Sequence, residues 1–130
     1  MSKSYSNVIN VFLPEKQLKK QIMSIVTDSI SIEEPKNPEN CIVYKLYQLL
    51  SSEAQTLKLK SKYEAGNFGY GEAKNMLYEL IINRFNNERA IFENLMKDTS
   101  IIEEELQKGA EKARIIARDV LKRVRSNIGY

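Results

Sequence analysis

The 130-residue sequence contains no histidine and no tryptophan. Without histidine there is no Ser-His or Cys-His nucleophile pair and no imidazole metal ligand. The single cysteine, Cys41, excludes an intramolecular disulfide and is typical of a reducing compartment. No run of about 18 apolar residues occurs, and the polar residues 1–7 lack the apolar stretch of a secretory signal. We therefore expect a cytoplasmic protein without membrane segments.

Helix breakers are also scarce. There are five glycines and three prolines, and the prolines all lie between positions 14 and 38. Apolar residues in the breaker-poor stretches recur at helical spacing, which predicts an all-α helical bundle. The first helix is expected over 14–27, followed by an extended, proline-containing loop over 31–40. Its apolar face comprises Leu18, Ile22, Ile25 and Val26.

Further helices are predicted from residue 38 or 39 to 50, from a capping box at Ser52 to about 64, from about 71 to 96, and from Ser100 onward. Gly66 should end the helix that precedes it, and Gly109 is expected to break the last stretch. Asn86 and Asn87 are expected to kink or interrupt the long helix. Its predicted core residues are Met76, Leu77, Leu80, Ile81, Phe85, Ile91, Phe92 and Leu95.

The net charge of +3 permits contact with a polyanion without demanding it. Four cations of the last helix, at spacings of four, four and three, share one face: Arg114, Arg118, Lys122 and Arg125. Such a stripe can follow a phosphate backbone. The alternative is a solvated face opposite the apolar stripe, partly neutralised by Glu111 and Asp119, and the pattern by itself favours this alternative.

Other residue types give weaker indications of chemistry. The consecutive glutamates at 103–105 suit the first turn of a helix, where the helix dipole favours negative charge, better than general acid–base work. Cys41 is expected to be buried. The glycine-rich block 66–71 lacks the sequence of a phosphate-binding loop. We interpret it as a turn whose Phe68 and Tyr70 pack inward, with stacking on an unpaired base as the alternative.

Several ordered blocks resemble a known family. Residues 1–4, Met-Ser-Lys-Ser, match the end of the Lys-Met-Ser-Lys-Ser signature of class I aminoacyl-tRNA synthetases. Residues 26–29 read Val-Thr-Asp-Ser, and residues 63–66, 69–74 and 109–114 also occur in order and spacing as in the C-terminal domain of tryptophanyl-tRNA synthetases. The resemblance covers essentially the whole chain.

The resemblance implies a tryptophan–tRNA ligase that uses ATP with Mg²⁺, binds tRNA-Trp and works as a homodimer. Residues 1–12 would be a remnant of the signature loop and linker, and 13–130 the C-terminal anticodon-binding helical domain. In the full enzyme Lys3, flanked by Ser2 and Ser4, would contact the ATP phosphates as signature-loop residues. The chain alone would lack the nucleotide-binding catalytic domain and is expected to be inactive.

The same resemblance assigns tRNA reading to the helical domain. Candidate contacts, chosen by residue type and placement, are Asn40, Lys74, Lys112, Arg114 and Arg118. The alternative function is a stand-alone helical protein-interaction module that does not bind RNA. The two hypotheses differ in whether binding of tRNA-Trp is saturable and depends on the anticodon.

Overall fold

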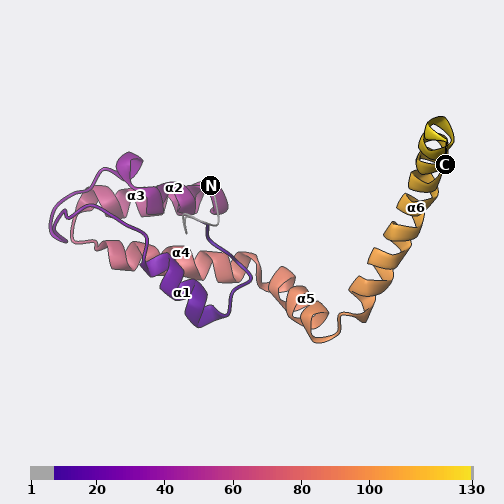
Figure 1. Cartoon of the computed structure of the whole chain (residues 1–130). Coiled ribbons are helices and arrows are strands. Elements are labelled where there is room, and N and C mark those ends of the chain that lie inside the picture. The colour runs from indigo at the N-terminus through magenta and orange to yellow at the C-terminus, as the bar shows by residue number, and fades with distance from the viewer. Residues whose placement is uncertain (1–7, 130) are drawn as a thin grey trace. The chain divides into compact units, whose positions relative to one another are not determined.

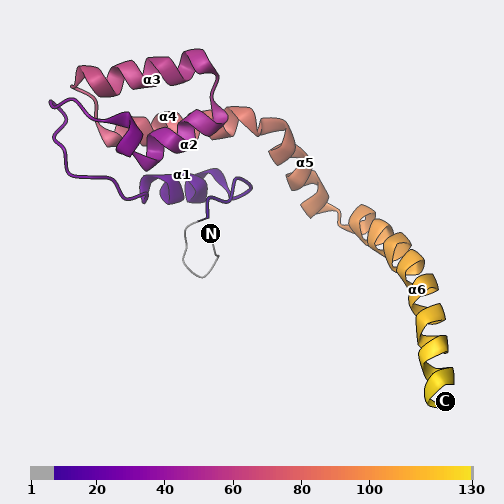
Figure 2. The same ribbon diagram turned by 90° about the horizontal axis from the view of Figure 1, so that it is seen from above.

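The computed structural model describes residues 8–129 of the chain, and every regular element among them is helical (Figures 1 and 2). The chain divides into two compact units, residues 1–89 and 90–130. In chain order the helices are α1 (Glu15–Met23), the 3₁₀ turn η2 (Pro38–Asn40), α2 (Ile42–Leu50), α3 (Glu53–Ala65), α4 (Tyr70–Arg84), α5 (Asn86–Lys97) and α6 (Ser100–Ile128). The predicted all-α class is confirmed. The proposed boundary at residue 12 stays a prediction.

The first unit is organised around α4, which packs against both α1 and α2. Helices α1 to α4 each contribute apolar side chains to one shared core, as the helical spacing predicts. Val26, expected on the apolar face of the first helix, is instead 86% exposed. The buried apolar side chains of this core are Leu18, Ile22, Cys41, Val43, Tyr44, Tyr47, Leu59, Tyr63, Phe68, Ala73, Leu77 and Ile81. All of them belong to the first unit.

An aromatic cluster forms one end of this core. The ring of Tyr63 lies 5.9 Å from that of Tyr44, 5.3 Å from that of Phe68 and 6.1 Å from that of Tyr70, measured between centroids. The tilted and edge-on geometries suit the quadrupoles of aromatic rings. The Tyr63 hydroxyl also lies 3.3 Å from the Cys41 sulfur. The expected burial of Cys41 and of Phe68 is confirmed, whereas Tyr70 is half-buried.

The proline-containing loop docks on the turn between α3 and α4. The amide of Lys36 donates to the Tyr63 carbonyl at 2.7 Å, and the amide of Phe68 donates to the Ile32 carbonyl at 3.1 Å. At Gly66, where φ is +75°, a Cβ atom would lie 2.5 Å from the Glu33 carbonyl oxygen. Only glycine therefore allows the two segments to approach this closely.

The start and end of several helices match the sequence predictions. Ser52 and Gln55 form the predicted capping box, in which the Ser52 amide donates to the Gln55 side chain at 2.9 Å. Gly66 follows the last residue of α3, and Gly129, with φ of +84°, ends α6. The interruption expected near Asn86 is present, because α4 ends at Arg84 and α5 begins at Asn86.

Four predicted boundaries are wrong. The helix expected from residue 38 or 39 begins only at Ile42, because residues 38–40 form the separate 3₁₀ turn η2 and Cys41 is extended. The first helix ends at Met23 rather than near 27, because a run of β-branched residues follows and the Lys74 ammonium binds the Met23 carbonyl. Ser100 does not cap α6: it is the first helical residue, and its amide donates to the Asp98 carboxylate at 3.0 Å. Gly109 does not break α6, because one glycine costs a helix only about 1 kcal/mol.

The second unit has no buried apolar side chain among its described residues. Its long helix, α6, runs for 29 residues with none of them buried. The predicted burial of Ile91 and Phe92 is wrong, since their exposed fractions are 60% and 38%. The amphipathic pattern of α5 and α6 is present, but nothing within their own unit buries the apolar side.

Candidate nucleic-acid interface

The cationic stripe of α6 is the largest group of exposed positive charge that the sequence predicts. A continuous helix carries the four cations on one side, as their spacing requires. All four are exposed: Arg114, Arg118, Lys122 and Arg125. The ion pairs found among residues 8–129 join other residues, such as Lys108 with Glu105 at 2.7 Å. The four charges are therefore not neutralised by a direct ion pair within the described chain.

A shallow hollow follows this stripe along α6. It is lined by Arg118, Leu121, Lys122, Arg125 and Ser126. Two guanidinium groups, an ammonium and a hydroxyl can all donate hydrogen bonds to phosphate oxygens, and guanidinium can do so through two parallel bonds. The hollow can thus accept the backbone of an extended strand rather than an enclosed small molecule.

Lys112 does not lie on the same side of α6 as Arg114 and Arg118. Two residues along a helix correspond to a rotation of about 200°, so Lys112 faces nearly opposite to Arg114. All three side chains are exposed. A single straight strand cannot contact Lys112 together with the other two, and the sequence candidates on α6 therefore form two groups.

Asn40 and Lys74 belong to the first unit rather than to the unit that holds α6. Asn40 is the exposed last residue of η2, a turn capped by the Asn37 side chain, which accepts from the Glu39 amide at 3.0 Å. Lys74 is half-buried on α4, and its ammonium donates to the Met23 carbonyl at 3.1 Å. A cation at the end of a helix interacts favourably with the helix dipole, so Lys74 already has a structural role at the end of α1.

Lys36 is a structural residue of the loop whose burial the sequence did not predict. Its side chain is only 3% exposed. Its ammonium donates to three backbone carbonyls, those of Ser31 at 2.6 Å, Ile32 at 3.3 Å and Glu34 at 3.0 Å. Lys36 therefore holds the loop that leads to Asn40 in one conformation. Two neighbouring prolines were the only signal that this lysine lies in an ordered loop.

The aromatic residues of the glycine-rich turn are engaged within the protein. Phe68 is 4% exposed, and the Lys62 ammonium lies 5.2 Å from its ring centroid. Lys62 also pairs with Glu72 at 2.9 Å. Burial, and next a hydrogen bond with Asp28, raises the pKa of Tyr70 above its ordinary value. The inward interpretation is confirmed for Phe68, and base stacking on that ring would require the turn to open.

The signature-loop candidates Ser2, Lys3 and Ser4 lie outside the described residues. Within residues 8–129 no group of three or more Cys, Asp or Glu side chains is arranged to hold a metal ion. No helix in the same range is long and apolar enough to cross a membrane.

Comparison with known proteins gives consistent matches over the whole chain. No protein-family model matches. The chain is 46% identical over 129 residues to a tryptophan–tRNA ligase of Fusobacterium nucleatum and 43% identical to one of Campylobacter jejuni. These alignments cover 99% of the chain but only 39% and 40% of the two relatives. The chain thus spans about two-fifths of the length of the curated relatives it matches.

A solved structure gives the same result. The tryptophanyl-tRNA synthetase of Campylobacter jejuni, complexed with ADP and tryptophane, superposes with a TM-score of 0.91 at 43% sequence identity. The match covers 100% of this chain and 41% of the solved one. Helical class, order of elements and sequence all agree, and the chain matches the C-terminal two-fifths of tryptophan–tRNA ligases.

Proposed function

We propose that this chain is the tRNA-binding, C-terminal part of a tryptophan–tRNA ligase, the enzyme that activates tryptophan with ATP and attaches it to tRNA-Trp. The observation that carries the proposal is the 46% identity over 129 residues to a curated ligase. The solved relative that binds ADP and tryptophane supports ATP use by the full-length protein.

The exposed stripe of α6 supports the RNA-binding part of the proposal. Each cation that meets a phosphate displaces a condensed counterion, which is the main source of affinity for nucleic acids. Arg114 and Arg118 are the best-supported contacts, because they are exposed and have no ion-pair partner among residues 8–129. Lys112 would meet a different part of the RNA.

Anticodon reading is assigned to the first unit. Anticodon bases are unpaired, so their edges are open to polar side chains. Asn40 offers an amide on an ordered turn, and the caged Lys36 limits the conformational freedom that binding would otherwise have to remove. Lys74 would contribute chiefly by holding α1 against α4.

The catalytic part of the proposal concerns the full-length protein. There Lys3, with Ser2 and Ser4, would bind the triphosphate of ATP with its Mg²⁺, and the enzyme would act as a cytoplasmic homodimer. The chain by itself would neither activate tryptophan nor charge tRNA, because it spans only about two-fifths of its relatives. Tryptophan-dependent exchange of pyrophosphate into ATP by the chain alone would contradict this.

The binding proposal is tested with two transcripts, tRNA-Trp and the same tRNA with its anticodon replaced. We expect saturable binding of both at low salt and a preference for the native anticodon that persists at moderate salt. Asn40→Ala should reduce that preference. Asn37→Ala alters the cap of the same turn but keeps the Asn40 side chain, so it is the control that shows how much of the loss comes from a change in the turn alone. A folded chain that is indifferent to tRNA would instead favour the protein-interaction module.

A further inference from the structure

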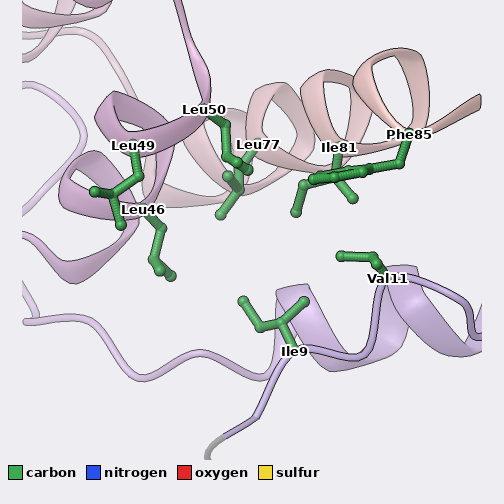
Figure 3. Close-up of a pocket in the computed structure, with 8 residues that line it drawn as sticks. All are labelled: Ile9, Val11, Leu46, Leu49, Leu50, Leu77, Ile81 and Phe85. Atoms are coloured by element: carbon green, nitrogen blue, oxygen red, sulfur yellow. The ribbon is translucent and has the colours of Figure 1, made fainter. Parts of the chain in front are cut away.

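An apolar groove opens on the surface of the first unit (Figure 3). One wall is formed by Ile9 and Val11, which precede α1. The facing wall comes from α2 and from the second half of α4 with the residue that follows it. All eight lining side chains are hydrocarbon: Ile9, Val11, Leu46, Leu49, Leu50, Leu77, Ile81 and Phe85. Leu49, at the edge, is 79% exposed, which is unusual for a leucine beside a core.

Polar bonds hold the wall that contains Ile9 and Val11 in place. The Gln21 side chain donates to the Val8 carbonyl at 2.5 Å and accepts from the Asn10 amide at 3.0 Å. On the other side of Val11, the buried Arg89 guanidinium donates to the Val11 carbonyl. Because both ends of this short segment are anchored, it cannot close onto α2 without breaking these bonds. The groove is thus pre-formed.

The size of the groove decides what it can hold. Its volume is about 160 Å³, close to the engineered cavity of about 150 Å³ that binds benzene. Sites for metabolites and cofactors usually measure about 300–1,000 Å³ and carry a few polar groups. A hydrocarbon-lined groove of this size fits one aromatic or branched side chain, which is how a packed protein segment fills a neighbour's surface.

We propose that the groove receives an apolar side chain from the preceding three-fifths of the full-length polypeptide, and so forms part of the contact between the two portions. The alignments cover 129 residues of this chain and the C-terminal 39–40% of the relatives. In those relatives the preceding portion of the polypeptide therefore ends fewer than ten residues before the position that aligns with Ile9. A tether of that length reaches at most about 30 Å.

This tether distinguishes the proposed occupant from a second copy of the chain. A segment held within that reach has an effective concentration on the order of millimolar, whereas another molecule must bind at its bulk concentration. Filling the groove also removes Leu49 and the flanking hydrocarbon surface from water. A pre-formed groove beside the junction therefore favours a partner from the same polypeptide.

The direct test is site-specific crosslinking in the full-length protein. Benzoylphenylalanine replaces Leu49 at the groove or, as control, Leu57, which is also exposed but lies on α3 outside the groove. We expect Leu49→benzoylphenylalanine to crosslink to a peptide from the preceding portion, at the mass of a single chain and several-fold more than the control. Crosslinks to a second copy, crosslinks to residues 90–130, or a yield equal to the control would each overturn the proposal.

A second measurement does not depend on the crosslinker. Leu49→Asp and Leu57→Asp are compared in the full-length protein by limited proteolysis of the junction before Ile9, with circular dichroism to check that both remain folded. Leu49→Asp should speed cleavage several-fold because a carboxylate in the groove expels the apolar occupant. Equal cleavage of the two variants would contradict the proposal. The inference rests on the proposed function in one respect, that the chain is part of a longer ligase. Neither readout involves tRNA, so the tRNA-binding part of the proposed function can fail without affecting this result.

Discussion

At the scale of single residues, Gly66 is the position where the backbone leaves no alternative. Its φ of +75° and ψ of −175° belong to a region that is essentially restricted to glycine. A methyl group there would also collide with the Glu33 carbonyl oxygen at 2.5 Å. The loop that carries Lys36 and leads to Asn40 is docked at this point, so one missing side chain determines where the candidate RNA-binding turn lies.

We expect Gly66→Ala to lower the free energy of unfolding by about 1–3 kcal/mol, through strain at a glycine-only conformation. The measurement is urea denaturation followed by circular dichroism. Gly71→Ala is the control, because a Cβ atom there meets nothing within 4 Å. Since Gly71 lies in the first turn of α4, its replacement should be neutral or stabilise by up to about 1 kcal/mol. Equal losses for the two variants would contradict the steric account.

Tyr63 predicts how the stability depends on alkaline pH. Burial, and then the hydrogen bond with Cys41, raises the pKa of this phenol far above its ordinary value of about 10. Above pH 10 the folded chain therefore holds a proton that the unfolded chain has lost, so stability falls as pH rises. Below that pH the contribution is fully present.

Tyr63→Phe tests this linkage. Removing the hydroxyl should cost about 1 kcal/mol at neutral pH, because the Cys41 thiol loses its partner. The same variant should lose less stability than the parent between pH 9 and pH 11, a range around the ordinary tyrosine pKa of about 10. Denaturation curves across this range provide the measurement. An unchanged pH dependence would show that other groups govern alkaline unfolding.

At the scale of elements, α6 combines two features that sequence periodicity detects and a third that it does not. The apolar stripe and the cationic stripe follow directly from the spacing of residues in a continuous helix. The exposure of both stripes is a tertiary result. The solvated-face interpretation assumed partial neutralisation of the cations by Glu111 and Asp119. Arg118 and Lys122 form no ion pair among the described residues, which favours the interpretation as a phosphate-binding stripe.

The salt dependence of tRNA binding tests the stripe of α6. For each phosphate contact removed, the slope of log affinity against log salt should fall in magnitude by about 0.7–0.9. Arg114→Gln with Arg118→Gln should therefore reduce the slope by roughly 1.4–1.8. Lys108→Gln is the control, since Lys108 is already paired with Glu105 at 2.7 Å. A double variant that leaves the slope unchanged would support the alternative interpretation, that the stripe is only a solvated surface.

At the scale of the whole molecule, burial is confined to one unit. Every buried side chain among residues 8–129 lies in the first unit. In folded proteins most of the stability of a helix comes from tertiary packing of its apolar face rather than from helix propensity. The first unit therefore has its own core. The second unit has no buried side chain among its described residues, so its helices lack the support of tertiary packing within their own unit.

Truncation after Arg89 tests this division. The shortened chain should keep a cooperative thermal transition, because every buried side chain among residues 8–129 lies at or before Arg89. The parent chain should show in addition a broad, non-cooperative loss of helix by circular dichroism. Loss of the cooperative transition on truncation would mean that residues 90–130 complete the core.

Much of the architecture is predictable because local signals act within a few residues. The capping box at Ser52, the glycines after α3 and α6 and the interruption near Asn86 are all encoded by neighbouring residues. The candidate site was less predictable. The cations of α6 could be placed on one face, but the use of Lys74 at the end of α1 and the burial of Lys36 depend on residues distant in sequence or on loop conformation.

The sequence by itself determined the helical class, most helix boundaries and the resemblance to the C-terminal part of tryptophan–tRNA ligases, because periodicity, caps and ordered motifs are read along the chain. Only the tertiary structure decided which apolar faces are buried. Leu77 and Ile91 fit the same helical pattern, yet one lies in a core and the other is 60% exposed. A periodic stripe states that a helix has an apolar side; what covers that side depends on segments that come together only on folding.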